Sequence, residues 1–293
     1  MHSIDWMSLP GPIDLHAHSR ESDGTESPRG LVTHAIEAGL GAVAITDHDT
    51  LSGWAEASDA ARELGIVLIP GIEFSAQIHY ASVHVLGYLP DPEAPSLLQE
   101  RIRIRADRVQ RAESMVQRIS ADYPLTWEHV LESAADGATI GRPHIADALV
   151  TLGVVANRSA AFETILHWQG GYYVPHVAPS PTSAIRIIRE AGGVPVIAHP
   201  GARGAQTMRR SVLKELVDAG LSGLEIEHRD NPPEAREWLR RRADEFGLFV
   251  TGSSDWHGAG KPNQMGEHST APEVLAQIVE QASGSEPVIP APR

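Results

Sequence analysis

Histidines and carboxylates recur where short apolar runs of this chain end. Nine of them could bind metal: His16, His18, Asp23, His48, Glu73, His84, His199, Asp255 and His257. Imidazole nitrogens and carboxylate oxygens are strong ligands for divalent metal ions. A lone histidine at a strand end is more often a hydrogen-bonded structural residue. Here, however, a histidine or carboxylate follows an apolar run at six segments. The pattern therefore predicts a metal-dependent hydrolase.

The spacing of the first pair supports this prediction. Side chains on a strand alternate between its two faces, so His16 and His18 share a face and can hold one ion. Asp14 shares that face, and we expect it to lie deeper and to orient an imidazole.

Composition limits the other possibilities. The chain has 293 residues, no Cys and a formal charge of −14. Thiolate sites and disulfides are thereby excluded, and the charge argues against a general binder of polyanions. No apolar stretch approaches a membrane span, and the first residues lack the features of a signal peptide. We expect a cytoplasmic protein without a membrane or an obligate protein partner.

The elements that must position these ligands alternate in type. Apolar runs at 13–16, 42–46, 67–72 and 83–89 are separated by helical patterns such as 28–39 and 55–64, and the alternation resumes near residue 182. Strand–helix alternation indicates an α/β fold with parallel strands, and barrels of this kind carry their active sites at the carboxyl ends of the strands.

The middle of the chain breaks the alternation, because 97–119 reads as one long helix with shorter helices after it. We predict a first barrel part at 1–92, an α-helical insertion over the active site at 93–178, a second barrel part at 179–283 and a mobile Pro-rich tail at 284–293.

Six segments together resemble a known family. They are His16-Ala17-His18-Ser19, Asp23-Gly24, Thr46-Asp47-His48-Asp49, Pro70-Gly71-Ile72-Glu73, Ala198-His199-Pro200 and Ser254-Asp255-Trp256-His257. They resemble, in order, the motifs of the PHP (polymerase and histidinol phosphatase) phosphoesterases. The resemblance implies a distorted (β/α)7 barrel holding three divalent metal ions, often manganese, with iron or zinc as alternatives.

The resemblance also implies how the ligands divide. The first metal would take His16, His18, Glu73 and Asp255, and the second would take Asp23, His48, Glu73 and His257. The third would take His84 and His199, with Glu73 bridging the first two ions. Asp23 stands where histidinol phosphatases often carry His, which argues against that activity.

The insertion contains a second signal, Gly141-Arg142-Pro143-His144. It resembles an element of the subfamily that hydrolyses nucleoside 3′,5′-bisphosphates and short oligoribonucleotides from the 5′ end. Arg142 offers a planar fork for a phosphate, and free amides at the helix start also favour anions. We therefore expect Arg142 and His144 to bind phosphate; the alternative is a solvated arginine beside a capping loop.

Three further features remain open between function and structure. His228 follows a strand and either meets the substrate, as a proton donor, or is structural. Tyr172 and Tyr173 either stack on a base or pack. The arginines of 101–118 either guide a nucleic acid or form a solvated face; we favour the solvated face, because acidic residues interleave.

The expected chemistry is attack of water on phosphorus. Metal binding lowers the pKa of water from about 16 to about 7, so no protein nucleophile is needed. Asp255 or His257 would move a proton, and Arg142 would neutralise phosphoryl oxygens. The rivals are an amidohydrolase, a cyclic or sugar phosphate esterase, and a non-catalytic PHP module; the complete ligand set disfavours the last.

Overall fold

The computed structural model describes residues 4–78, 81–202 and 208–290. Seven strands form one sheet in chain order. They are β1 (Ile13–Asp14), β2 (Ala42–Ile45), β3 (Val67–Ile78), β4 (Ala81–Tyr88), β5 (Val194–Ile197), β6 (Gly223–Glu227) and β7 (Phe249–Gly252). A parallel bridge between Ala17 and Trp256, with His18 N–H donating to the Trp256 carbonyl at 2.8 Å, joins the two ends of the sheet. The sheet is thus a nearly closed barrel, and the predicted distorted α/β barrel is confirmed.

Strand direction departs from the sequence prediction at one place. Strands β1 to β3 and β5 to β7 pair in parallel, whereas β4 is antiparallel to both of its neighbours. The expected run at 67–72 continues as strand to Ile78 instead of entering a helix. An antiparallel hairpin needs no helical crossover, so the alternation rule fails here. The hairpin projects Glu73 and His84 toward the same end of the barrel as the other ligands.

Helices cover the outside of the barrel. They are α1 (Pro28–Glu37), α2 (Trp54–Leu64), α7 (Pro181–Glu190), α8 (Arg210–Asp218), α9 (Pro233–Phe246) and α10 (Pro272–Gln281). Ser27 and Ser180 cap α1 and α7, each just before a proline at the first helical turn. Helix α10 was not predicted; its buried Leu275 and Ile278 pack against residues of β1 to β5.

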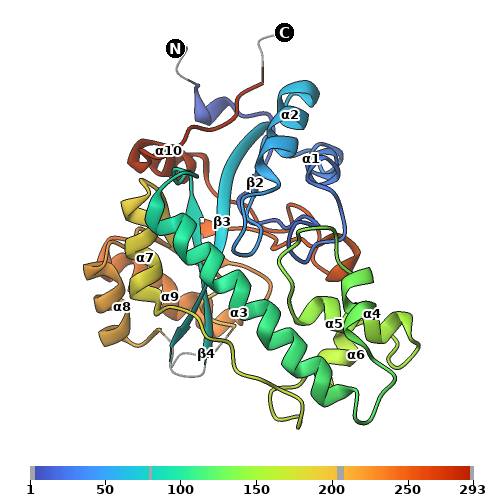
Figure 1. The fold of residues 1–293 in the computed structure, drawn as a ribbon. Coiled ribbons are helices and arrows are strands. Elements are labelled where there is room, and N and C mark those ends of the chain that lie inside the picture. Colours follow the sequence, from blue (N-terminus) through green and yellow to red (C-terminus); the bar gives the residue numbers. More distant parts are fainter. Residues whose placement is uncertain (1–3, 79–80, 203–207, 291–293) are drawn as a thin grey trace.

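Between β4 and α7 lie the helices of the insertion: α3 (Pro95–Ile119), α4 (Trp127–Glu132), α5 (Arg142–Thr151) and α6 (Arg158–Glu163). In Figure 1, α4, α5 and α6 gather at the lower right beside the far end of α3, while both termini lie at the top. These helices have an apolar cluster of their own, which includes Met115, Val130 and Leu149. Among the described residues, no helix is long and apolar enough to cross a membrane.

The C-terminal segment is tied to the base of the barrel. Val288 exchanges two backbone hydrogen bonds with Leu68 (2.8 and 3.0 Å), and Ser285 N–H donates to the Leu89 carbonyl. The Val288 side chain is buried. This differs from the mobile tail expected from its prolines, because the prolines leave the donors of Ser285 and Val288 available for pairing. Residues 291–293 lie outside the described part of the chain.

Candidate metal centre

The nine predicted ligands meet at one end of the barrel. All nine are described, and all but the partly exposed His84 are buried. His16 and His18 follow β1, His48 follows β2, His199 follows β5, and Asp255 and His257 follow β7. Carboxyl ends of parallel strands lie at the same edge of a sheet, which is why residues so distant in sequence converge.

Glu73 occupies the centre of the cluster. Its Oε2 lies 3.4, 3.1 and 3.0 Å from nitrogens of His16, His18 and His48, and its Oε1 lies 2.7 and 3.3 Å from His84 and His199. Burial alone would raise the pKa of Glu73, but the surrounding imidazoles hold it well below its ordinary value. One ionised carboxylate therefore faces five imidazoles.

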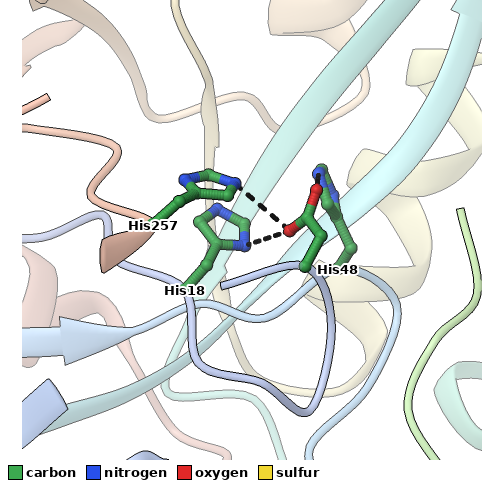
Figure 2. A group of neighbouring side chains, drawn as sticks. His18, His48 and His257 are labelled. Atoms are coloured by element: carbon green, nitrogen blue, oxygen red, sulfur yellow. Dashed lines mark ion pairs between the residues drawn. The ribbon is translucent and has the colours of Figure 1, made fainter. Parts of the chain in front are cut away.

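Three groups of side chains have ligand atoms close enough for one ion each. They are His16, His18, Glu73 and Asp255; His18, Asp23, His48 and His257; and His48, Glu73 and His84. Figure 2 shows His18, His48 and His257 around a carboxylate, where Asp23 Oδ1 lies 3.6 Å from His18 Nδ1 and 3.1 Å from His257 Nε2. The first group equals the predicted set. The second differs from the predicted set in having His18 in place of Glu73. The third contains His84 with His48 and Glu73; the predicted His199 is outside it, although His199 Nε2 lies 3.3 Å from Glu73 Oε1.

Proton positions on two histidines test whether these groups fit cations. His16 Nδ1 lies 2.9 Å from Glu225 Oε1, and His257 Nδ1 lies 2.8 Å from the Asp255 carbonyl. Each contact places a proton on Nδ1. Burial lowers the pKa of His257 to about 4, so this ring is neutral and its Nε2 carries a lone pair. That lone pair faces Asp23 Oδ1 at 3.1 Å, which is repulsive unless a cation lies between, so the donors fit divalent metal ions.

Glu225 is a supporting residue that the sequence analysis missed. Besides holding His16, its Oε2 accepts the backbone N–H of His199 at 2.8 Å. Burial raises the pKa of Glu225, but the facing His16 and His228 rings outweigh it and lower the pKa to about 2. The sequence could have indicated this residue, because Glu225 is a charged residue inside the apolar run of β6 and its side chain is on the strand face that points into the barrel.

Asp14 plays a different part from the one expected. Its carboxylate accepts the backbone N–H groups of His16 (3.3 Å), Ser254 (3.0 Å) and Gly266 (2.8 Å). It therefore fixes the backbone that carries ligands, and the imidazole of His16 is oriented by Glu225 instead.

Backbone strain also marks this edge. Asp49, His199 and Asp255 have φ of 53°, 30° and 53°, values uncommon for residues other than glycine. The Asp49 carboxylate is held by Ser75 N–H and Oγ (2.7 and 2.6 Å) and by Arg108 Nε (2.8 Å). Strained backbone persists only where its surroundings fix it, as they do here.

Two cationic or titratable groups stand beside Asp255. Lys261 Nζ lies 2.7 Å from Asp255 Oδ2, and no motif had indicated it. His228 Nε2 lies 3.8 Å from the same oxygen, while His228 Nδ1 accepts the N–H of Asp230. In neutral His228 the proton is thus on Nε2, toward the cluster. His228 does lie at the site, as its strand-end position suggested.

The insertion forms the facing wall. A pocket of about 180 Å³ is lined by His48 and His84 from the barrel and by Arg108, Arg111, Arg142, Tyr173 and His176 from the insertion. We call it the basic pocket; its further lining residues are Asp23, Ser75, Ser82, Pro143, Phe162 and Lys261. The Arg142 guanidinium lies over Phe162 (5.0 Å) and near Tyr173 (5.7 Å). Arg142 therefore lines the basic pocket beside the predicted metal ligands, and its phosphate-binding role stays a prediction.

Other predictions for the insertion have mixed outcomes. His144 Nδ1 accepts the Gly141 N–H at 3.1 Å, so this nitrogen caps α5, and we find no contact that supports the phosphate-binding role. The solvated-face interpretation holds for Arg103, which pairs with Glu100, but is wrong for Arg108 and Arg111 in the basic pocket. Tyr172 packs inside the insertion and donates to Asp122 (2.6 Å), leaving Tyr173 to line the pocket.

Arg158 joins the insertion to the metal centre. Its guanidinium makes a two-point contact with Asp147 and donates to the Asp23 carbonyl at 2.9 Å. A Cβ at Gly260 would lie 2.1 Å from Arg158 Nη1, so a larger residue at this position would require the guanidinium to move. Nothing local in the sequence indicated this contact, because 135 residues separate its partners.

A cluster of histidine and carboxylate ligands at the mouth of a seven-stranded barrel is typical of a metal-dependent hydrolase. The PHP domain model matches residues 14–139. A 3′,5′-nucleoside bisphosphate phosphatase of Chromobacterium violaceum is 32% identical over 85% of this chain and 88% of its own. A 5′-3′ exoribonuclease of Haemophilus influenzae is 34% identical, covering 83% and 89%. A phosphoribosyl 1,2-cyclic phosphate 1,2-diphosphodiesterase of Eggerthella lenta is 30% identical, covering 84% and 94%.

Solved structures agree with these relatives. The crystal structure described as that of a metal-dependent phosphoesterase of Bifidobacterium adolescentis superposes with a TM-score of 0.89 at 43% identity, covering 94% of this chain and 98% of that one. The chain belongs to the PHP family. It is a metal-dependent phosphoesterase, and the resemblance seen in the motifs is confirmed.

Proposed function

We propose that this protein hydrolyses nucleoside 3′,5′-bisphosphates to 5′-monophosphates, and short 5′-phosphorylated RNA in the same way. The carrying observation is the basic pocket beside the metal centre. Four cationic side chains line it, Arg108, Arg111, Arg142 and Lys261. Arg108 also pairs with Asp49 and Lys261 with Asp255, so the positive charge of the pocket is partly balanced. A cluster of guanidinium groups still favours a second phosphate near the one under attack. The relatives named as a nucleoside bisphosphate phosphatase and an exoribonuclease support the same substrate class.

We propose that three divalent ions, manganese first with iron or zinc as alternatives, bind His16, His18, Asp23, His48, Glu73, His84, His199, Asp255 and His257. Nitrogen and oxygen donors without sulfur suit these metals. When bound, such ions lower the pKa of a water molecule and neutralise phosphoryl oxygens.

The chain's own groups would bind the substrate and move protons. Arg142 and Arg108 would hold the second phosphate and so aim the first at the metal ligands. Lys261, 2.7 Å from Asp255, would neutralise charge on the departing phosphate. Neutral His228 would donate a hydrogen bond from Nε2 to the leaving oxygen, and Asp255 or His257 would carry the proton when they are not fully engaged as ligands. His144 would support Arg142 through the start of α5.

The working unit in this proposal is a barrel, 1–92 and 179–283, with the insertion 93–178 as the substrate wall. A cytoplasmic location and the absence of an obligate partner remain predictions from composition.

A cyclic or sugar phosphate is the second candidate, favoured by the 30% identical diphosphodiesterase. An amidohydrolase activity has less support, because the basic pocket suits phosphate.

The deciding experiment offers adenosine 3′,5′-bisphosphate to the Mn²⁺-loaded protein and follows release of phosphate and 5′-AMP. Turnover should be absent in His16→Ala. No turnover by a protein that holds its metals, as measured by elemental analysis, would move the substrate to cyclic or sugar phosphates. No turnover and no bound metal would overturn the catalytic proposal.

A further inference from the structure

A second pocket opens beside the metal centre, on the other side of Phe162 and Pro143 from the basic pocket's arginines. It has a volume of about 320 Å³. We call it the side pocket. Its lining residues are Asp23, Pro143, Arg158, Ser159, Phe162, Glu163, His257, Gly260, Lys261 and Pro262. Asp23, Pro143, Phe162 and Lys261 line both pockets, so the two are neighbours across shared walls.

The walls of the side pocket are firmly placed. Ser159, Phe162 and Glu163 stand at the i, i+3 and i+4 positions of α6 and so share one helix face. The facing loop carries Gly260 and Pro262. Arg158 fixes the distance between helix and loop through Asp147, the Asp23 carbonyl and its close approach to Gly260.

The chemistry of the side pocket differs from that of the basic pocket. Phe162, Pro143 and Pro262 offer flat apolar surfaces. Both cationic side chains of the lining are already paired, Arg158 with Asp147 and Lys261 with Asp255. Asp23 and Glu163 add carboxylates that would repel a phosphate. An uncharged flat ring is therefore the suitable occupant, because apolar and aromatic walls favour stacking.

We propose that the side pocket holds the nucleobase of the substrate. This inference rests on the proposed function. The metal ligands would bind the attacked phosphate, the basic pocket the second phosphate, and the side pocket the base. The shared walls place all three within reach of one nucleotide.

The test compares kcat/KM for adenosine 3′,5′-bisphosphate with that for a base-free analogue, 1-deoxyribose 3,5-bisphosphate. The wild type should prefer the nucleotide by about 5- to 150-fold, the range that corresponds to stacking of one base. Ser159→Trp, which fills the side pocket from its exposed rim, should bring this ratio close to one. Glu163→Trp, on the same helix face, repeats the test should Ser159→Trp fail to fold.

Two further variants separate the side pocket from the alternatives. Gln169→Trp, at an exposed residue outside both pockets, should keep the wild-type ratio. Tyr173→Ala should also keep it, although it alters the basic pocket; loss of the ratio there, with Ser159→Trp unaffected, would put the base on Tyr173 and overturn the proposal. Equal turnover of both compounds by the wild type would sink the side-pocket assignment alone. Turnover of neither would sink the proposed function, and this assignment with it.

Discussion

The metal centre and the insertion wall face each other across one pocket, yet they are built in opposite ways. Metal-centre side chains follow strands and are almost completely buried, and backbone bonds such as Glu73 N–H to the Thr46 carbonyl (3.0 Å) fix them. Arg142, Phe162 and Tyr173 are only partly buried and stand on short helices or a loop. In our proposal, the barrel would supply chemistry common to any phosphate ester, and the insertion would select which ester binds.

The largest effect is expected from Glu73→Gln, which tests whether the metal centre acts on all phosphate esters alike. Loss of the central charge should weaken the two ligand groups that contain Glu73, so turnover should fall about 10³-fold or more on every phosphate ester. Elemental analysis and steady-state kinetics on two unrelated esters would measure it. Glu227→Gln, at a side chain paired with Arg240, serves as the control. Retention of full metal content and activity in Glu73→Gln would contradict the central role.

A substitution in the insertion should instead be selective. Arg142→Ala should lower kcat/KM for a nucleoside bisphosphate by about 10- to 100-fold, because a charge-assisted hydrogen bond contributes roughly 1.5–3 kcal/mol. A monophosphate ester without the second phosphate should be affected far less. Equal losses on both substrates would show that Arg142 acts on the metal centre, and the division between the two regions would fail.

Glu225→Gln probes the support beneath the metal centre. The amide can still accept from His199 N–H but no longer offers a charge to His16, so metal affinity should fall about 10- to 100-fold. Titration with Mn²⁺ followed by calorimetry measures this without any turnover. A normal affinity would mean that His16 keeps its tautomer without Glu225.

Much of this molecule was predictable, for identifiable reasons. His16, His48, His199 and Asp255 follow apolar runs, and the alternation of strands and helices placed those runs in a barrel with a shared carboxyl edge. The helical patterns at 55–64 and 97–119 are α2 and α3, which end at Leu64 and Ile119 as predicted.

What escaped prediction depends on contacts between distant segments. Arg158 meets Asp23, and Lys261 meets Asp255, only once the insertion and the last loop have folded over the barrel. The β3–β4 hairpin was missed because apolar periodicity gives no strand direction. The capping contact of His144 was not foreseen, because a histidine that caps a helix and one that binds phosphate look the same in sequence. Its phosphate-binding role stays a prediction.

His176 in the insertion allows a test by pH. Its Nδ1 lies 2.8 Å from Asp107, and burial, then Arg108, lowers its pKa from 6.5 to about 4, against the opposing Asp49 and Asp107 and with Arg111 nearby. Between pH 4 and 6.5 the unfolded chain binds a proton that the folded chain does not, so stability rises with pH. His176→Gln should reduce this rise by about 1.4 kcal/mol between pH 5 and 6. Urea unfolding at both pH values measures it, with the partly exposed His34→Gln as the control. An unchanged slope would count against a neutral His176.

The smallest effect should come from the base of the barrel, far from both regions. Val288 is buried and paired with Leu68, whereas Ile289 beside it is exposed. Val288→Ala should lower the free energy of unfolding by about 1 kcal/mol, and Ile289→Ala by less than about 0.5 kcal/mol. Neither should change kcat/KM or the preference between substrates. Equal effects on stability would mean that the segment is as mobile as its prolines suggested, and a change in substrate preference would show that the base of the barrel communicates with its mouth.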